Sequence, residues 1–374
     1  MVFAPPFSCL APRSEGVDDS RSPVSDDPSD RRNFLRKGVA GLAAASMSLG
    51  CAQAASAVPP YRILMINFRG ETDIERGFRR HMAYAGAAVD IRVRDTDRDV
   101  SRVAGILRHE AGFRPDIIIT WGTGVTLAVT GTQDSPSRHA LSDVPVVFAP
   151  VASPVQSGIV SRLSGHGRNL TGVVDVVPTE VQLRTMQTYL PFNCFGVIYS
   201  PAELNSPVVL DELRRFAGKS RIKLIERPLK LDAAGRAVGD GVEGMVADLR
   251  RQGAQWLYVP PDAFLIGLLP RVALAALAQR LPIFGATEPA AREGGALVGL
   301  VCRYSSVGQL AAVKALEILA KGRAASELPI ETPKRFLLLV NMGMARSLGG
   351  LYPPLEMLNA AEFIDTPPSL KPTS

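Results

Sequence analysis

Two kinds of hydrophobic periodicity alternate along the chain from about residue 60. Short continuous apolar runs are typical of parallel strands that helices cover on both faces. The first such runs are RILMINF (62–68), PDIIIT (115–120) and VPVVFAP (144–150). The helix predicted after the first run has an apolar face made of Ile74, Phe78, Met82 and Ala85. Val89, Ile91 and Val93 then alternate with polar residues, as in an edge strand, so the segment predicts a doubly wound α/β sheet.

A second α/β series follows residue 176. Its predicted strands are FGVIYS (195–200), IKLIERP (222–228), QWLYVPP (255–261) and LPIFGAT (281–287). One of the helices between them has Val242, Met245, Val246 and Leu249 at helical spacing. Two similar series in tandem imply two lobes. A strand (296–304), a helix bearing Ala312, Leu316 and Leu319, and a last strand (335–342) remain after the second series.

Length and composition agree with two globular domains. A chain of 374 residues suits two cores of middle size, and 46% hydrophobic with 21% charged residues excludes general disorder. The formal charge is +6, but basic residues are scattered singly among acidic ones. Without a long Lys/Arg run, the charge argues against nucleic acid as a partner.

Residues 1–57 are expected to be a disordered leader with an export signal. DRRNFLRKG (30–38) is a basic region, and the uncharged run that follows to residue 50 is too short and too rich in Ala and Gly to span a bilayer. Arg31 and Arg32, followed by Phe34 and Leu35, resemble the twin-arginine motif. We therefore expect export to the periplasm in a folded form.

Two processing routes stay open. Small residues between Ala52 and Ala57 fit a cleavage site near Ala54–Ala57, so that the mature chain starts near Val58. Alternatively, Cys51 becomes a lipid-modified first residue, although Leu49 stands one place closer to it than that signal usually has. Cys194 and Cys302 then remain in an oxidising compartment, either free and buried or paired, and they are too few for a metal site.

Polar side chains follow the predicted strand ends, where ligands bind in open α/β sheets. The candidate ligand-binding residues are Arg69, Glu71, Thr72, Trp121, Gly122, Thr123, Ser153, Ser200, Asn205, Ser206, Asp262, Glu288 and Tyr304. Small hydroxyls, amides, carboxylates and aromatic rings match a zwitterion or a small polar molecule better than a phosphate. The ring of Trp121 or Tyr304 can cover an apolar or cationic body.

The remaining candidates divide by charge. Thr123 and Ser153, with neighbouring backbone N–H groups, can take a carboxylate, whereas Asp262 or Glu288 can take an ammonium. Structural roles compete with these assignments. Trp121 can pack against the sheet edge, serines and threonines after strands can cap helices, and surface glutamates can be solvated.

Two other kinds of site are disfavoured by the motifs. Gly122 and Gly124 form only G-x-G, since Leu127 stands where a nucleotide loop has its third glycine. None of the histidines (His81, His109, His139 and His166) follows a predicted strand, and no H-E-x-x-H or G-x-S-x-G motif occurs. A carboxylate pair such as Asp262 with Glu288 or Glu71 leaves an enzyme as the least favoured alternative. No metal or cofactor is expected.

The same segments resemble a known family. RGETDIERGF, PDIIITWGTGVT, VPVVFAPVASPVQSG, GRNLTGV, YSPAELNS, LYVPPDAFL, FGATEPA, GLVCRYSSVGQLAA and RFLLLVNM occur in the order typical of substrate-binding proteins of bacterial ABC importers. The likeness covers Tyr61 to about Pro354. It is to the type I periplasmic-binding fold, in the family that includes binders of tryptophan, phenylalanine and related amino acids.

The resemblance implies two Rossmann-like lobes joined by a hinge of three strands. Lobe 1 would hold residues 60–171 and 302–332, and lobe 2 would hold 172–301 and 333–374. A ligand would bind between them and be enclosed by hinge closure. The family's ligand loops correspond to residues 121–123, 151–154 and 200–206, to Asp262, and to residues 287–288.

One departure bears on the ligand. Binders of aromatic amino acids in this family tend to have Thr-Asp-Pro where this chain has Ala152-Ser153-Pro154, so one acidic group is lost. We therefore expect a monomer without enzymatic activity that captures a small polar ligand, such as an amino acid, and delivers it to an inner-membrane ABC permease. The alternative is a periplasmic sensor that presents its closed form to a receptor or kinase.

Overall fold

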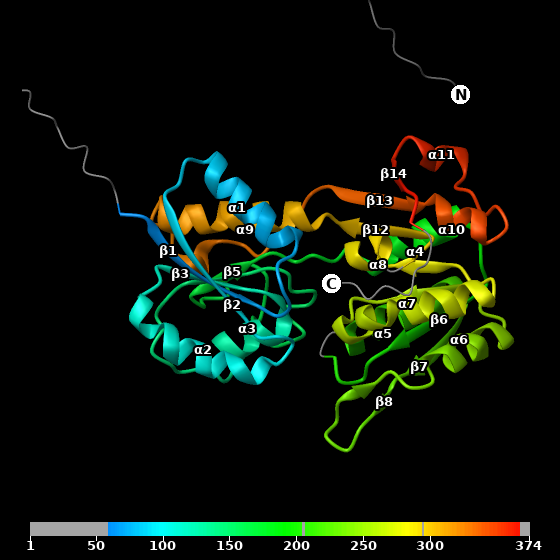
Figure 1. The fold of residues 1–374 in the computed structure, drawn as a ribbon, viewed down its shortest axis with the longest axis horizontal. Coiled ribbons are helices and arrows are strands. Elements are labelled where there is room, and N and C mark those ends of the chain that lie inside the picture. Colours follow the sequence, from blue (N-terminus) through cyan, green and yellow to red (C-terminus); the bar gives the residue numbers. More distant parts are fainter. Residues whose placement is uncertain (1–58, 204–205, 294, 367–374) are drawn as a thin grey trace, which may run out of the picture. The chain divides into compact units, whose positions relative to one another are not determined.

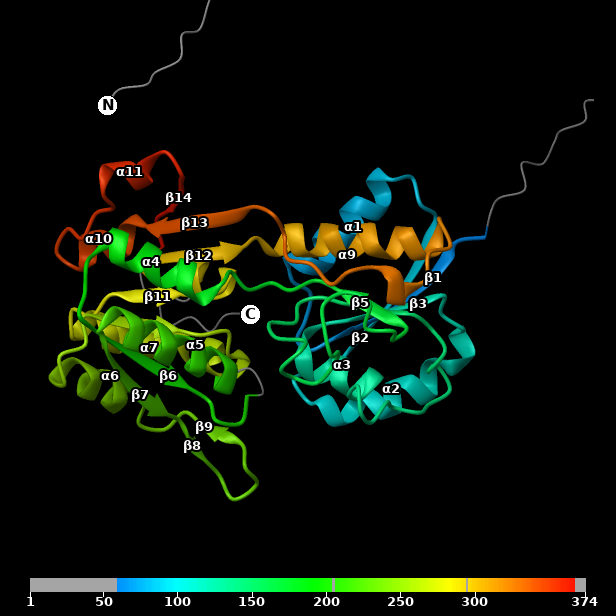
Figure 2. The same cartoon turned by 180° about the vertical axis from the view of Figure 1, so that it is seen from behind.

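The computed structural model describes residues 59–203, 206–293 and 295–366. Two large sheets with helices on their faces, together with one two-stranded hairpin, make up this part of the chain (Figures 1 and 2). The α/β class predicted from the apolar runs is confirmed. The predicted export signal, including both processing routes, lies outside the described residues.

The first sheet has five parallel strands in the order β2-β1-β3-β4-β5. They are β1 (Tyr61–Asn67), β2 (Val89–Asp95), β3 (Ile117–Thr120), β4 (Val146–Phe148) and β5 (Leu170–Gly172). Ile63 and Met65 face α1 (Asp73–Tyr84) and α9 (Tyr304–Leu319). Leu64 and Ile66 face the cluster that includes α2 (Val103–Glu110) and α3 (Gly122–Thr130). Burial on both faces explains why these strands are continuous apolar runs, and β2 is the edge strand that its alternation predicts.

The second sheet has seven strands in the order β14-β13-β12-β11-β10-β6-β7. They are β6 (Cys194–Tyr199), β7 (Lys223–Pro228), β10 (Trp256–Val259), β11 (Ile283–Gly285), β12 (Val298–Cys302), β13 (Phe336–Asn341) and β14 (Ala361–Ile364). Its helices are α4 (Thr179–Tyr189), α5 (Ser206–Ser220), α6 (Val242–Arg251), α7 (Ala263–Ala278), α8 (Glu288–Arg292), α10 (Met342–Ser347) and α11 (Leu355–Leu358). All neighbouring strands pair in parallel except β12 with β13.

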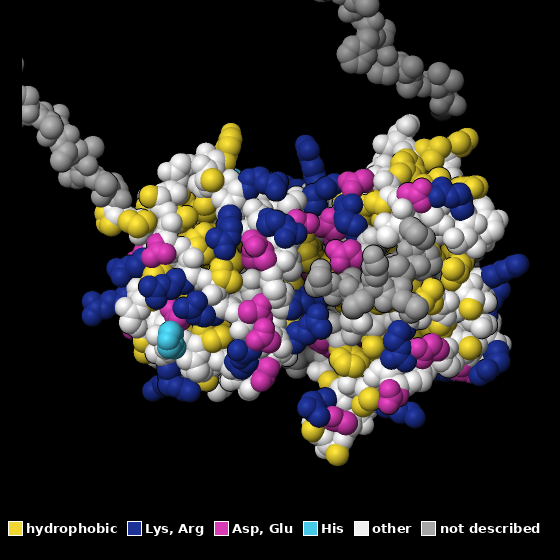
Figure 3. Space-filling model, viewed as in Figure 1, with side chains coloured by type: hydrophobic (Ala, Val, Ile, Leu, Met, Phe, Trp, Pro, Cys, Tyr) yellow, Lys and Arg dark blue, Asp and Glu magenta, His cyan; other side chains and the backbone are white. Residues whose placement is uncertain are grey.

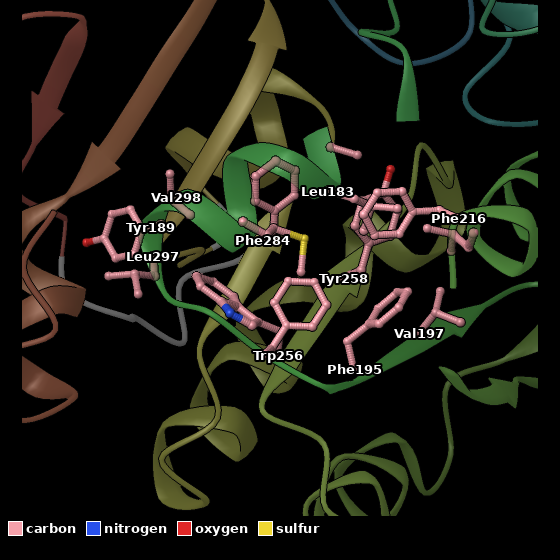
Figure 4. Packing of buried hydrophobic residues seen from close by; sticks show 14 of the residues in the cluster. Leu183, Tyr189, Phe195, Val197, Phe216, Trp256, Tyr258, Phe284, Leu297 and Val298 are labelled. Atoms are coloured by element: carbon pink, nitrogen blue, oxygen red, sulfur yellow. The ribbon is translucent and has the colours of Figure 1, made fainter. Parts of the chain in front are cut away.

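Aromatic rings fill one face of the second sheet (Figure 4). Tyr258 and Phe284 stack with their centroids 5.8 Å apart, and Tyr189 meets Trp256 edge-on. Their polar atoms are all paired: the Trp256 indole donates to the carbonyl of Leu190 at 3.0 Å, and the Tyr258 hydroxyl donates to a side-chain oxygen of α4. Paired polar atoms and ring contacts make this cluster a structural core.

Helices α1 and α9 cross with their backbones in contact. A Cβ atom added at Gly308 would lie 1.9 Å from the carbonyl oxygen of Ile74, and one added at Gly77 would lie 2.3 Å from that of Ser305. The crossing therefore requires glycine at both positions, because any larger side chain would collide with the backbone of the other helix. Because α9 follows β12 of the second sheet, this crossing fastens a late part of the chain onto the first sheet.

Three segments connect the two sheets. The chain leaves the first sheet after β5, returns between β12 and α9, and leaves again before β13. Val173 on the first segment pairs in parallel with Glu331 on the third, so these two run side by side. The chain thus passes three times between the two sheets, while the residue limits given above for the lobes stay predictions.

Some short elements have no signal in the sequence pattern. They are the hairpin of β8 (Lys230–Leu231) and β9 (Ala237–Val238), the strands β5 and β14, and the 3-10 helices η1 (Val100–Arg102), η2 (Ala111–Phe113) and η3 (Ala325–Glu327). These elements have two to four residues, over which alternation cannot be recognised, whereas the equally short β3 and β4 lie within longer apolar runs. Basic and acidic side chains are interspersed over the face shown in Figure 3.

Candidate functional site

A pocket of about 500 Å³ lies at the carboxyl ends of strands from both sheets. From the side of the first sheet it is lined by Phe68, Arg69, Arg98, Val100, Trp121, Gly122, Thr123, Gly124, Val125, Pro150, Ala152 and Asp175. From the other side it is lined by Ala202, Glu203, Arg236, Pro261, Asp262, Ala263, Ile266 and Thr287, together with Tyr304 at the start of α9. Such a volume and mixed lining are typical of small-molecule sites.

The turn after β3 brings the first turn of α3 to the pocket. Trp121 donates its backbone N–H to the carbonyl of Ile66 at 3.0 Å, and Gly122 then adopts a φ of +84°, which glycine accepts without strain. The hydroxyl of Thr126 bonds to the Gly122 carbonyl and to Thr120. Residues 122–125 line the pocket, so the positive end of the α3 dipole points at whatever binds there.

Aromatic and cationic neighbours hold the indole of Trp121 in place, but its N–H donates no hydrogen bond to the described residues. Its ring stacks on Phe68 with centroids 6.2 Å apart, and the Arg69 guanidinium carbon lies 5.6 Å from the ring centroid. Within the described residues, the buried Trp121 Nε1 and Arg69 Nε have no hydrogen-bond partner, and neither has the Thr287 hydroxyl across the pocket. Buried polar atoms are nearly always paired in proteins. Two donors and a hydroxyl without partners in one pocket make it the candidate ligand site.

The two carboxylates in the pocket wall differ in their surroundings. Asp262 caps α7, accepting backbone N–H groups from Leu265 at 2.8 Å and from Ser200 at 2.6 Å. Burial, followed by the charge of Glu203, raises the pKa of Asp262 to about 7. Asp175 is only 6% exposed, and burial raises its pKa to about 7 as well. Among the described residues, no other residue donates a hydrogen bond to its carboxylate.

The structure brings together part of the set predicted from the sequence. The predicted residues that line the pocket are Arg69, Trp121, Gly122, Thr123, Asp262 and Tyr304. Those outside its lining are Glu71, Thr72, Ser153, Ser200, Ser206 and Glu288, and Asn205 lies outside the described residues. The assignment of each of these residues to a ligand stays a prediction.

Local structure explains why several of them are turned away. Thr72 and Glu75 form a capping box at the start of α1, and Glu71 lies 3.5 Å from the guanidinium of Arg79. Glu288 accepts the backbone N–H of Tyr304 at 2.5 Å and pairs with Arg292 on its own helix. The carboxylate pairs considered for catalysis, Asp262 with Glu288 or Glu71, are therefore not assembled in this pocket.

Other pocket residues were missed by the sequence reasoning, chiefly Phe68, Arg98, Asp175 and Arg236, whereas Thr287 belongs to one of the predicted ligand loops. Two of them had a usable signal. Asp175 is a lone acid in the apolar run GVVDVV, and Arg98 follows the carboxyl end of a predicted strand. Arg236 comes from the β8–β9 hairpin, whose two-residue strands leave no pattern to read.

Both remaining cysteines, Cys194 and Cys302, are free and buried. The described residues contain no cluster of three His, Cys, Asp or Glu side chains that could hold a metal ion. Among them, no helix is both long enough and apolar enough to cross a membrane.

The family model of ABC transporter substrate binding proteins matches residues 71–363. The chain therefore belongs to this family, and the resemblance seen in its motifs is confirmed. It is also similar to the tyrosine-binding protein of Clostridioides difficile, with 26% identity over 222 residues. That match covers 59% of this chain and 61% of the relative, so the chain spans less than two thirds of that protein.

Solved structures show the same fold. A conserved domain protein from Vibrio cholerae has a TM-score of 0.69 at 22% identity, covering 82% of this chain and 99% of its own. An ABC domain from Streptococcus pneumonia in complex with L-Trp has a TM-score of 0.67 at 21% identity, covering 80% and 99%. A ligand-free substrate binding protein with adhesive properties from Clostridium difficile has a TM-score of 0.63 at 23% identity, covering 82% and 99%.

Proposed function

We propose that this protein captures a small zwitterionic molecule, an amino acid or a close relative of one, in the pocket between its two sheets. The observation that carries the proposal is the set of partnerless polar atoms there: Arg69 Nε, Trp121 Nε1 and the Thr287 hydroxyl. Family membership supports binding rather than catalysis as the role of the pocket. The tyrosine-binding relative and the L-Trp complex support an amino acid as the ligand class.

The two charges of a zwitterion have suitable counterparts in this pocket. The guanidinium of Arg69, the indole N–H of Trp121 and the start of α3 provide donors and positive charge for a carboxylate. Asp175 provides the ammonium partner, because its oxygens are free of side-chain partners among the described residues while those of Asp262 accept two backbone N–H groups. The ring of Trp121 covers the body of the ligand.

Delivery to a membrane permease completes the proposal. A ligand that contacts both Trp121 and Thr287 binds more tightly to a conformation in which the two sheets approach each other. Hinge closure over the three connecting segments would give a permease a distinct surface to recognise. We propose that the protein acts as an exported monomer, either released after cleavage near Ala54–Ala57 or held by a lipid on Cys51.

A ligand screen tests this function directly. Purified protein is melted in the presence of amino acids, amines, organic acids and sugars. A ligand at 100 times its dissociation constant adds about 2.7 kcal/mol to the free energy of unfolding. We expect a few amino acids or related zwitterions to raise the melting temperature. If every compound leaves it unchanged, the proposal fails; if only sugars raise it, the ligand class is wrong.

The two tryptophans of the chain allow a matched test of the pocket. Trp121→Phe keeps an aromatic ring but removes an N–H that has no partner in the protein, so we expect unchanged stability without ligand and an affinity weaker by roughly tenfold. Trp256→Phe removes an N–H that donates to Leu190, so stability should fall with affinity retained. Calorimetric titration and thermal unfolding of both variants separate the outcomes. Equal affinity of Trp121→Phe and wild type would show that the indole N–H of Trp121 does not bind the ligand.

A further inference from the structure

Arg98 lines the pocket from an unusual backbone conformation. It lies between β2 and η1, and both Asp97 (φ 50°) and Arg98 (φ 67°) adopt the left-handed region. For residues other than glycine this region costs about 1–2 kcal/mol each, and such residues cluster at functional sites. A left-handed pair therefore needs a reason in the surrounding structure.

The loop is held in this conformation by the end of β1. Arg98 donates its backbone N–H to the carbonyl of Phe68 at 2.7 Å, and Thr96 bonds to the carbonyl of Asn67 at 2.9 Å. The Thr96 hydroxyl also donates to Phe68 at 3.2 Å. Since Phe68 and Arg69 themselves line the pocket, these bonds fix Arg98 beside the wall that holds Trp121.

The side chain of Arg98 forms no ion pair with the described aspartates that neighbour it in sequence. Asp95 accepts the backbone N–H of Asp97, Asp97 pairs with Arg102, and Asp99 accepts two hydrogen bonds from Ser101. In the described part of the chain, no carboxylate forms an ion pair with Arg98. Arg98 is exposed and belongs to the pocket lining, so its guanidinium is available to a charged group of a ligand.

Other left-handed arginines of the chain have a different explanation. Arg114 and Arg221 directly follow the ends of η2 and α5, and Arg280 comes shortly after α7. Left-handed residues commonly end helices, and none of these three lines the pocket. Arg98 follows a strand, so helix termination does not account for its conformation.

The charge balance of the pocket points the same way. Arg69 and Arg98 have no carboxylate partner among the described residues, whereas Arg236 pairs with Asp232 at 2.8 Å. On the acidic side, burial raises the pKa of Glu203, and the carboxylate of Asp262 already accepts two backbone N–H groups. If the α-carboxylate of the ligand binds to Arg69, the guanidinium of Arg98 still has no acidic partner.

We propose that Arg98 is a specificity-determining residue that selects ligands bearing an acid group in addition to the α-carboxylate. The inference rests on the proposed function, because it takes an amino-acid-like ligand as given. The second acid group bonds to the guanidinium of Arg98, while Trp121 and Phe68 cover the segment between the two ends. A pocket of about 500 Å³ accommodates a linker as long as an aromatic ring.

Acid and amide pairs of equal size test the selection. The probes are L-glutamate with L-glutamine, L-2-aminoadipate with its side-chain amide, and 4-carboxy-L-phenylalanine with 4-carbamoyl-L-phenylalanine. Affinities are measured by calorimetric titration of the whole purified protein. A hydrogen bond between charged groups contributes enough that at least one acid should bind roughly 10- to 100-fold more tightly than its amide. The preference should shrink as salt is added.

Arg98→Gly is the decisive variant because glycine suits the left-handed backbone. It should melt no lower than the wild type and should bind acid and amide equally. The matched control, Arg221→Gly, replaces a left-handed arginine outside the pocket and should keep the acid preference.

Two outcomes overturn the inference and are distinguishable. If neutral amino acids bind as tightly as acidic ones, or if Arg98→Gly keeps the acid preference, the selection by Arg98 is wrong while the proposed function stands. If no amino acid or related zwitterion binds at all, the proposed function fails and this inference fails with it.

Discussion

Replacing Asp175 by asparagine should yield a protein that is more stable than the wild type above pH 7 and no longer captures its ligand. Asp175 is 6% exposed, and burial raises its pKa from 3.8 to about 7. The folded state therefore binds more protons than the unfolded state between about pH 4 and 7. The free energy of unfolding falls as the pH rises through this window, and it stays lowered above pH 7.

Asparagine removes that cost because it carries no charge. The full shift corresponds to roughly 4 kcal/mol, and desolvation of the amide offsets part of it, so we expect a gain of about 1–3 kcal/mol at pH 8. Thermal unfolding at pH 5 and pH 8 measures it: the variant should gain at pH 8 and little at pH 5. Affinity should fall at least roughly 100-fold, since a buried ammonium loses its charged partner.

Asp262→Asn is the matched control for this experiment. Its carboxylate is equally buried and its pKa is raised in the same direction, but both of its oxygens accept backbone N–H groups. An amide offers one acceptor oxygen, so this variant should lose stability instead of gaining it. If Asp175→Asn binds ligand as the wild type does, the ammonium site lies elsewhere in the pocket.

Gly308→Ala should lower the melting temperature strongly. One methyl group at this position meets the carbonyl oxygen of Ile74 at 1.9 Å, so α9 has to move away from α1. Overpacking of this kind costs about 3 kcal/mol, which corresponds to a fall of roughly 6–12 °C in a domain of this size. The measurement is calorimetric melting of the variant beside the wild type.

A helical glycine without close neighbours provides the control. Gly267 lies within α7, and an added Cβ would meet nothing within 4 Å. Gly267→Ala should therefore stabilise the protein by about 0.5–1 kcal/mol through reduced backbone entropy of the unfolded chain. If Gly308→Ala melts as high as Gly267→Ala, the close crossing of α1 and α9 contributes little to stability.

The strands were predictable because their chemistry is local. β1, β3 and β4 are buried on both faces, and each is a continuous apolar run. Such a run can be recognised in the sequence without knowing which elements pack against it. The hairpin of β8 and β9 was not predictable, because two-residue strands lie below the length at which alternation is recognisable.

The pocket was only partly predictable. The rule that ligands bind at the carboxyl ends of parallel strands locates residues near the site, but it does not say where their side chains point. It placed Trp121 and Asp262 correctly at the pocket, but it could not tell that Thr72 and Glu288 are turned towards helix ends. Asp175 was missed because it follows an edge strand of three residues and enters the pocket from a connecting segment. Such a position depends on how the chain crosses between sheets.

The division of the two tryptophans between the sheets makes the protein its own optical probe. Trp121 lies at the pocket, and Trp256 is fully buried in the aromatic core of the other sheet. Ligand that covers Trp121 changes the fluorescence of one indole, while the emission of Trp256 stays constant as an internal reference. Occupancy can then be followed in unlabelled protein at millisecond resolution, and the signal disappears in the Trp121→Phe variant.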